Sequence, residues 1–239
     1  ILRNFCFISS FFFDIDKNSD LNSNLPHMLP NKDMWEKIMS SNGISNNDKI
    51  VIYDNSKVLS SCRLWYMLLY FGHSKKLVSV LDGGLEKWKK NNFPITEDHT
   101  QLKLTNYKAY ENKFMVKNLD EIDKNIENKV FSLVDARSKD RFEGKTKEPR
   151  EGVRSGSIKN SICIPFNNVI KDDKTFKDKE ELKVIFNNII SDIDNNNVVF
   201  SCGSGITSCV LALAYSLINN NYNPTIYDGS WAEYGKIFK

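Results

Sequence analysis

Short apolar runs alternate with segments of helical periodicity along most of this chain. Runs of strand length lie at 11–16, 50–53, 77–81, 130–134, 162–164, 198–200 and 225–227. Segments with helical periodicity lie at 31–41, 62–71, 85–90, 115–126, 182–190 and 206–217. Because strands that alternate with helices form parallel sheets with helices on both faces, the pattern predicts an α/β fold.

Two sequence patterns occur twice, about 147 residues apart. Residues 49–54 (KIVIYD) match 197–202 (NVVFSC), and residues 81–88 (LDGGLEKW) match 227–234 (YDGSWAEY). A repeat of whole strand and turn units predicts two homologous α/β domains in tandem.

Polar residues without sustained periodicity separate the two copies. We therefore expect a first domain at 1–98, a linker at 99–113 and a second domain at 114–239. Within the second domain, the polar residues 138–157 are expected to form a long loop, and residues 228–231 a turn. The apolar run that starts near Phe5 is expected to be a buried strand of the first domain.

The segment 202–207 (CGSGIT) is the strongest candidate for chemistry, since it joins a predicted buried strand to a predicted helix. Backbone N–H groups of a glycine-punctuated turn and the positive end of a helix dipole stabilise a thiolate, so they lower the pKa of a cysteine. A buried structural cysteine fits the same spacing. The repeat puts Asp54 where Cys202 stands, so only the second copy keeps the thiol, and Asp54 is expected to stabilise a turn.

Composition narrows the class of protein further. The formal net charge is +3, with both signs interspersed, and 41% of the residues are hydrophobic, so neither direct nucleic-acid binding nor membrane binding is indicated. The five cysteines are widely spaced, form no CxxC pair and form no metal-ligand cluster. We therefore expect reduced thiols, no metal, no cofactor and a cytoplasmic location. The chain starts at Ile1 rather than Met, which leaves a mitochondrial address open.

Several separated motifs resemble the two-domain rhodanese sulfurtransferases. Segment 202–207 is similar to the active loop of the 3-mercaptopyruvate sulfurtransferase branch, whereas the thiosulfate branch has Arg-Lys where this chain has Gly203 and Ser204. Residues 135–156 resemble the substrate loop of the same branch, and residues 13–30, with FDID and PHMLP, resemble its first domain. The sequence departs from the family at 157–161, where SIKNS replaces the usual HIPGA.

The resemblance implies a sulfurtransferase with two rhodanese-like domains and its active loop in the second. Cys202 would take sulfur from 3-mercaptopyruvate as a persulfide, release pyruvate and pass the sulfur to a thiol or to cyanide. Thioredoxin, glutathione and a sulfur-carrier protein are the implied acceptors. The N–H groups of Gly203, Gly205, Ile206 and Thr207 would hold the transferred sulfur as part of the substrate site.

The resemblance also assigns roles to five side chains outside the cysteine. Arg141 and Arg150 would bind the carboxylate and ketone of the donor, for which the planar guanidinium is suited. Ser204, His27 and Asp16 would form a relay for general acid–base chemistry, which requires the first domain to reach the Cys202 turn. Solvated loop arginines and an isolated histidine are the alternatives.

Two further arginines and three alternative functions complete the expectations. Arg137 and Arg154 are expected to form structural ion pairs. Thiosulfate sulfurtransferase is the nearest alternative function, and a sulfur-relay scaffold for tRNA thiolation is another. A cysteine phosphatase of related fold is disfavoured because its Cys-x5-Arg loop requires arginine where this chain has Ser208.

Overall fold

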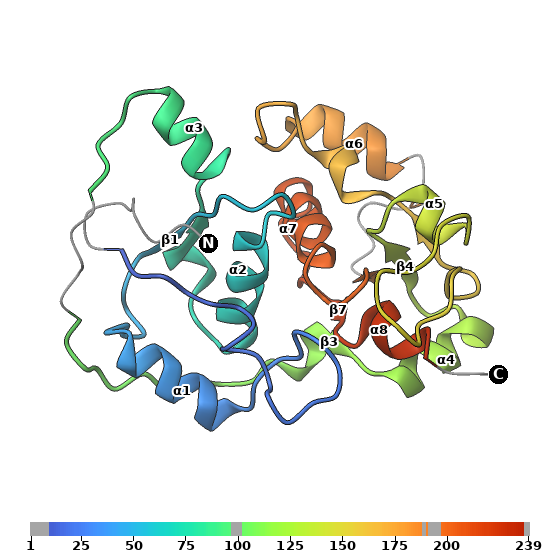
Figure 1. Cartoon of the computed structure of the whole chain (residues 1–239), viewed down its shortest axis with the longest axis horizontal. Helices are drawn as coiled ribbons and strands as arrows, with labels where there is room; N and C mark the ends of the chain where they lie inside the picture. The colour runs from blue at the N-terminus through green and yellow to red at the C-terminus, as the bar shows by residue number, and fades with distance from the viewer. Residues whose placement is uncertain (1–9, 97–101, 188–189, 191–196, 237–239) are drawn as a thin grey trace.

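A computed structural model describes residues 10–96, 102–187, 190 and 197–236 of the chain, which form two α/β halves side by side (Figure 1). The first half contains α1 (Lys32–Ser41), β1 (Ile50–Ile52), α2 (Ser61–Tyr70), β2 (Val78–Val80) and α3 (Gly84–Lys90). The second half contains β3 (Val116–Lys117), α4 (Leu119–Asn128), β4 (Ser132–Asp135), α5 (Lys139–Phe142), β5 (Ile162–Cys163), α6 (Lys179–Asn187), β6 (Val198–Ser201), α7 (Ser208–Ile218), β7 (Ile226–Tyr227) and α8 (Ser230–Tyr234). Short 3₁₀ helices occupy Lys75–Leu77, Lys113–Met115 and Phe166–Val169.

Each half has its own parallel sheet. In the described residues, β1 pairs with β2 in the first half, and the second half has a five-stranded sheet in the order β3-β7-β6-β4-β5. Phe200 of β6 lies opposite Val134 of β4 on one side and Ile226 of β7 on the other. The predicted α/β class with parallel sheets is confirmed.

Helices cover both faces of the five-stranded sheet because consecutive strand residues point to opposite sides. Val134 and Phe200 pack in the main core with α6 and α7. Their neighbours Leu133 and Val199 pack in a second cluster with Ile122 of α4 and with α8. The main core also contains α1 and α2 of the first half, so the halves share one continuous apolar interior.

The repeat is visible in the structure as matching backbone contacts. The carbonyl of Cys202 accepts a hydrogen bond from Trp231 N at 2.9 Å, and the carbonyl of Asp54 accepts one from Leu85 N at 3.0 Å. The Asp54 carboxylate also accepts hydrogen bonds from the hydroxyl of Ser60 and from the backbone N–H of α2 at Ser61. Asp54 therefore stabilises its own turn through side-chain hydrogen bonds, at the position where the second half has a thiol.

The two halves exchange equivalent contacts across their interface. Asp82 of the first half accepts a hydrogen bond from the backbone N–H of Phe176 at 2.8 Å. Its counterpart in the repeat, Asp228 of the second half, accepts one from the backbone N–H of Leu29 at 2.8 Å. Helices α2 and α7 also pack against each other across the interface (Figure 1). The halves are thus fixed to each other by equivalent polar contacts and by apolar packing.

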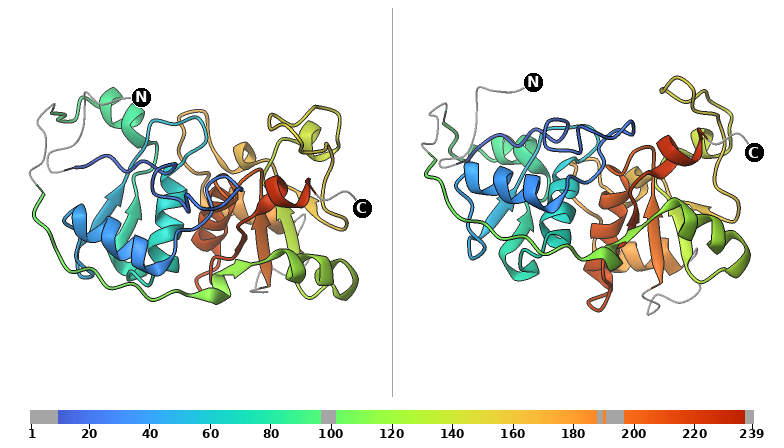
Figure 2. Two further views of the ribbon diagram at one scale, coloured as in Figure 1. Left: turned by 60° about the horizontal axis from the view of Figure 1, so that its bottom comes forward. Right: turned by 90° about the horizontal axis from the view of Figure 1, so that it is seen from below.

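The described part of the expected linker is an extended strap along the first half (Figure 2). The backbone N–H groups of Thr105, Tyr107 and Ala109 donate to Ser40 O, Ser40 Oγ and Glu36 Oε1, respectively, at 2.9 to 3.1 Å. These bonds hold the strap on α1. Residues 97–101 lie outside the described residues, and the expected domain boundaries stay a prediction.

The structure corrects the prediction for the N-terminal segment. Residues 11–16 form no strand: residues 10–13 have no regular structure and a turn follows. Asp14 accepts a hydrogen bond from Lys17 N at 3.3 Å, and Ser19 Oγ donates to Ile15 O at 2.7 Å, so polar side chains close the turn. The part of the expected strand before residue 10 lies outside the described residues.

Four other predicted elements have different bounds in the structure. The helix expected at 115–126 starts at Leu119, because Asn118 and Glu121 form a capping box and residues 116–117 pair with β7. The loop expected at 138–157 contains α5, and the turn expected at 228–231 continues into α8. The helix expected at 182–190 starts earlier, at Lys179, and its end at 188–189 lies outside the described residues.

Candidate active site

The Cys202 loop starts where β6 ends, and hydrogen bonds to α8 hold its backbone in place. The backbone N–H of Cys202 donates to Ser230 Oγ at 3.2 Å, and its carbonyl accepts from Trp231 N. The carbonyl of Gly203 accepts from Ala232 N at 2.9 Å. These bonds connect two loops at the carboxyl edge of the sheet, so the loop conformation is fixed before any substrate binds.

The loop environment favours the thiolate of Cys202, which is 1% exposed. Burial raises the pKa of the thiol, but hydrogen bonds from the Thr207 hydroxyl and from the backbone N–H groups of Ser204 and Ser208 lower it, and the net pKa lies below the usual value. Burial raises the pKa of Cys209 to about 12. The hydrogen bonds of the loop therefore favour the thiolate at Cys202 and not at its neighbour Cys209 on α7.

The first half reaches this loop through His27, as the relay hypothesis requires. His27 Nδ1 lies 2.9 Å from Ser204 Oγ, and His27 Nε2 lies 3.0 Å from Asp16 Oδ1. The Asp16 side chain is 82% exposed, whereas the His27 side chain is 21% exposed. The three residues are therefore in contact in the order Ser204, His27, Asp16, with the carboxylate at the solvent end.

The charge state of His27 decides which atoms donate in the hydrogen bonds that join Ser204, His27 and Asp16. Burial lowers the pKa of His27, Asp16 raises it, and the cations Arg150 and Arg63 lower it, so the net pKa lies below the usual value and the imidazole is neutral near pH 7. Since a carboxylate only accepts, Nε2–H donates to Asp16 and Nδ1 accepts from the Ser204 hydroxyl. Ser204 in turn accepts from Arg150 Nη2 at 3.0 Å.

The two substrate-loop arginines reach the same loop. A Cβ atom at Gly203 would lie 3.1 Å from Arg141 Nη2 and 3.5 Å from Arg150 Nη1, so glycine at this position leaves room for both guanidinium groups. Gly205 has φ +78° and is buried on the other side of the loop. Ile206 and Thr207 follow as the first turn towards α7, where their carbonyls accept the N–H groups of the helix.

Arg141 is held in place by an acidic residue that the sequence did not single out. Glu148, 5% exposed, accepts from Arg141 Nε at 3.0 Å and Nη2 at 2.6 Å. The same carboxylate accepts from Arg137 Nη1 at 2.9 Å, and Arg137 also binds Asp135. Two carboxylates thus neutralise two guanidinium groups, and Arg137 forms the expected structural ion pairs.

Arg63 of α2 is a second residue that sequence reasoning missed. Its side chain is fully buried, donates to the carbonyl of His27 at 2.6 Å and to the carbonyl of Gly205 at 3.2 Å, and pairs with Asp228 at 2.8 Å. One guanidinium therefore joins the loop that carries His27 in the first half to the cysteine loop and Asp228 in the second half. Its place in an apolar helical segment gave the only signal, since an arginine rarely occupies a buried face without partners.

The expectation for Arg154 is wrong. The described residues give Arg154 no ion pair; its guanidinium lies 4.6 Å from the centroid of the Trp231 ring and 5.8 Å from that of Tyr234. The indole Nε1 of Trp231 donates to the Arg154 carbonyl at 2.8 Å. Stacking on the aromatic rings of α8 takes the place of the carboxylate.

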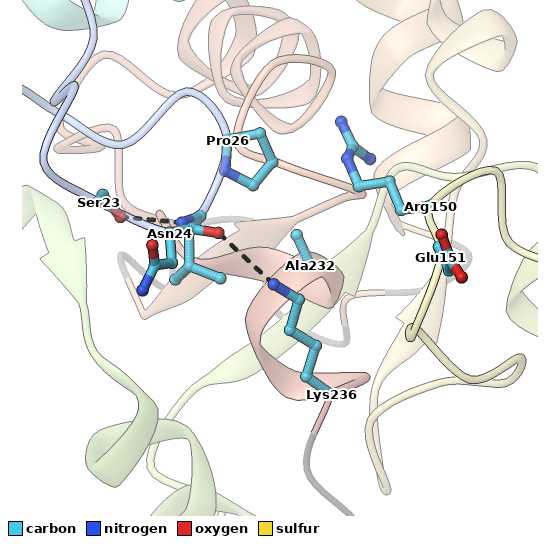
Figure 3. Close-up of a pocket in the computed structure, with 8 residues that line it drawn as sticks. Ser23, Asn24, Pro26, Arg150, Glu151, Ala232 and Lys236 are labelled. Carbon is cyan, nitrogen blue, oxygen red and sulfur yellow. Dashed lines mark hydrogen bonds between the residues drawn. The ribbon is translucent and has the colours of Figure 1, made fainter.

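A pocket of about 380 Å³ opens beside the loop between the two halves. Figure 3 shows the 23–26 segment of the first half on one side and Arg150, Ala232 and Lys236 of the second half around the rest. Arg150 also binds Ser204 and Ala232 also binds Gly203, so two residues of the pocket wall contact the Cys202 loop. The residues predicted for the site therefore converge at the interface of the halves.

Comparisons with known proteins agree with this arrangement. The sequence profile of the rhodanese-like domain matches residues 15–91 and 118–236. The thiosulfate/3-mercaptopyruvate sulfurtransferase 1, mitochondrial, of Arabidopsis thaliana is 36% identical, over 93% of this chain and 63% of that protein. The human 3-mercaptopyruvate sulfurtransferase is 36% identical, over 93% of this chain and 74% of that protein.

Among solved structures, SseA from Escherichia coli, described as a 3-mercaptopyruvate sulfotransferase with the rhodanese fold, superposes with a TM-score of 0.79 at 31% identity. The match covers 92% of this chain and 80% of that one. This chain belongs to the rhodanese superfamily, with two rhodanese-like domains. Within the superfamily it belongs to the 3-mercaptopyruvate sulfurtransferase branch, as its motifs predicted.

Proposed function

We propose that this chain is a 3-mercaptopyruvate sulfurtransferase that carries sulfur on Cys202. The observation that carries the proposal is the position of Ser204 Oγ in the cysteine loop, 3.0 Å from Arg150 Nη2 and 2.9 Å from His27 Nδ1. A group that can bind a carboxylate, a proton relay and a thiolate thus meet at residues 202–204. The relatives named above bear this activity in their names, although the chain spans only 63% of the Arabidopsis enzyme.

The local charge supports a donor with a single carboxylate. Arg137 and Arg141 are balanced by Asp135 and Glu148, so Arg150 supplies the one unbalanced positive charge among these five groups. The neutral Gly203 and Ser204 add none. A 2-oxo acid with one carboxylate matches a net charge of +1 better than the doubly charged thiosulfate does.

The residues support a balanced first half-reaction. The Cys202 thiolate attacks the donor sulfur, the carbon–sulfur bond breaks, and its electron pair enters the enolate of pyruvate. As the sulfur–sulfur bond forms, the proton of the donor thiol passes through Ser204 Oγ to His27 Nδ1, and the relay returns it to the enolate carbon. The persulfide anion stays in the ring of N–H groups at residues 203–207.

In the second half-reaction a thiol or cyanide removes the outer sulfur. Thioredoxin, glutathione and a sulfur-carrier protein are the acceptors we propose, and the cytoplasm is the proposed location. The first Arabidopsis relative carries "mitochondrial" in its name, which makes a mitochondrial location the alternative. In the described part of the chain, no helix combines the length and apolar character that crossing a bilayer requires.

Turnover of the purified chain tests the proposal. We expect pyruvate from 3-mercaptopyruvate in the presence of a thiol, and a stoichiometric persulfide on Cys202 by intact-mass spectrometry when the thiol is left out. Cys202→Ser is expected to abolish both signals. Cys209→Ala is expected to retain them, because the Cys209 thiol donates to the carbonyl of Gly205 and burial raises its pKa. If the unmodified chain forms no pyruvate from 3-mercaptopyruvate, the proposed enzymatic activity is refuted.

Thiosulfate is the second donor candidate, because the Arabidopsis relative is named for both donors. Adding charge to the loop separates the two readings. Ser204→Arg, with Gly203 retained, is expected to shift the ratio of the two kcat/KM values towards thiosulfate. An unchanged ratio would mean that loop charge does not set donor preference. A chain that accepts a persulfide from another protein but turns over neither donor would be a relay scaffold.

A further inference from the structure

Lys236 places an ammonium group on the rim of the interface pocket. It lies in the turn that follows α8, four residues after Ala232, whose N–H donates to the carbonyl of Gly203. Lys236 Nζ donates to the carbonyl of Asn24 at 3.5 Å, a long hydrogen bond, and the described residues provide no carboxylate within ion-pair distance. Figure 3 shows this side chain directed towards the pocket and the 23–26 segment.

The pocket has an excess of positive charge. Arg150 lines it as a second cation, and among the described residues it pairs with the Ser204 hydroxyl rather than with a carboxylate. Glu151 is the one acidic residue in the lining. Leu25, Pro26 and Ala232 supply apolar surface between these charges. A small molecule with a carboxylate and a short apolar stem fits this wall chemistry.

We propose that Lys236 and this pocket bind the carboxylate of a low-molecular-weight thiol acceptor, an inference that rests on the sulfurtransferase function proposed above. A volume of about 380 Å³ is typical of a site for a small organic ligand and exceeds what a three-carbon donor fills. The donor leaves as pyruvate before the acceptor reacts, so the pocket is open to a second ligand in the persulfide state.

The acceptor step is balanced without a further reagent. The thiolate of the bound acceptor attacks the outer sulfur of the Cys202 persulfide, and a new sulfur–sulfur bond forms on the acceptor. The bond between the two sulfur atoms on the enzyme breaks, and its electron pair returns to Cys202 as the thiolate. The acceptor leaves as a persulfide, with Cys202 ready for another donor.

The test measures acceptor preference in the isolated second half-reaction. The chain is loaded with 3-mercaptopyruvate, separated from donor and pyruvate, and mixed with 3-mercaptopropionate, which carries a carboxylate, or with 2-mercaptoethanol, which is neutral. The decay of the persulfide gives a second-order rate constant for each thiol, corrected for its own thiolate fraction. For the unmodified chain we expect the anionic thiol to react about tenfold faster than the neutral thiol after this correction.

Substitutions that remove a positive or a negative charge from the pocket should have opposite effects on the rate constant. Lys236→Ala is expected to lower the rate constant for 3-mercaptopropionate about fivefold and to leave that for 2-mercaptoethanol within twofold. Glu151→Gln is expected to raise the former, Lys236→Arg to preserve it, and Lys90→Ala, at the exposed end of α3, to change neither.

Three results would overturn the inference. Equal losses for both thiols after Lys236→Ala would indicate a structural role. A raised KM for 3-mercaptopyruvate with unchanged acceptor rates would assign Lys236 to the donor. Fast reaction with a thioredoxin but with neither small thiol would assign the surface to a protein acceptor. Failure to form any persulfide would instead refute the proposed sulfurtransferase function, so the two failures are distinguishable.

Discussion

Arg63 and Asp228, which lie in different halves of the chain, form a buried ion pair with 2.8 Å between Nη1 and Oδ1. Both side chains are almost fully excluded from solvent, at 0% and 4% exposure. The remaining bonds of this pair go to the carbonyls of His27 and Gly205 and to the backbone N–H of Leu29. The same pair thus joins the halves and sets the distance between the histidine and cysteine loops.

Loss of one member of this pair should destabilise the fold strongly. Arg63→Met leaves the Asp228 carboxylate buried without its cation, and we expect the free energy of unfolding to fall by about 3–5 kcal/mol in urea denaturation. The double variant Arg63→Met/Asp228→Leu should lose less than the sum of the single losses. Lys117→Met, which breaks a half-exposed pair with Glu121, is the control and should cost below about 1 kcal/mol. A similar small loss for Arg63→Met would contradict the role of the pair.

The relay residues should contribute unequally to pyruvate formation. His27 has φ +61°, a conformation that asparagine tolerates, so His27→Asn removes the base with little backbone strain. We expect kcat to fall about 10²–10⁴-fold while KM for 3-mercaptopyruvate stays within about threefold. Asp16→Asn should lower kcat less than about fivefold, since its carboxylate is 82% exposed. Equal losses for the two variants would show that the carboxylate is a full member of the relay.

The hydroxyl of Thr207 should control the pH at which Cys202 becomes reactive. It donates a hydrogen bond that lowers the pKa of the thiol, so Thr207→Val should raise this pKa and move the acidic limb of the reaction to higher pH. At pH values below the pKa of the thiol, iodoacetamide should alkylate Cys202 about tenfold more slowly in Thr207→Val than in the unmodified chain.

Mass mapping of the alkylated peptide separates Cys202 from Cys163, whose thiol pKa is raised to about 11 by burial. Thr105→Val, on the strap, serves as the control because its hydroxyl donates to Ile44 O, far from the thiol. An unshifted alkylation profile in Thr207→Val would show that the backbone N–H groups alone stabilise the thiolate.

Glu148 should act on the donor through Arg141. Glu148→Gln removes the charged partner that orients the guanidinium, so KM for 3-mercaptopyruvate is expected to rise about tenfold with a smaller change in kcat. Stability should also fall by about 1–3 kcal/mol, since the buried Arg137 loses the same partner. Glu143→Gln, an exposed residue of the same loop, should change neither quantity. An unaltered KM in Glu148→Gln would contradict positioning of Arg141 by Glu148.

Much of the fold could be predicted because its signals are local. Apolar runs of strand length and helical periodicity located β1, β2, β4, β6, α1 and α2, and the duplicated segments 49–54 and 197–202 predicted two related halves. The errors also have local causes. A capping box at Asn118 delayed α4, and the side chains of Asp14 and Ser19 closed turns where a strand was expected.

The sequence by itself determined the family and the α/β class, and it predicted the cysteine loop at 202–207 and the pair Arg141 and Arg150, because short motifs with fixed spacing carry this information. Only the tertiary structure decided which groups surround the thiol. Ser204 and His27 are 177 positions apart, and Arg63 and Gly205 are 142 apart, so their contacts exist only because the two halves pack against each other. The energy that packs the halves together is spread over many apolar contacts of the interface, so a short sequence motif does not predict which residues meet there.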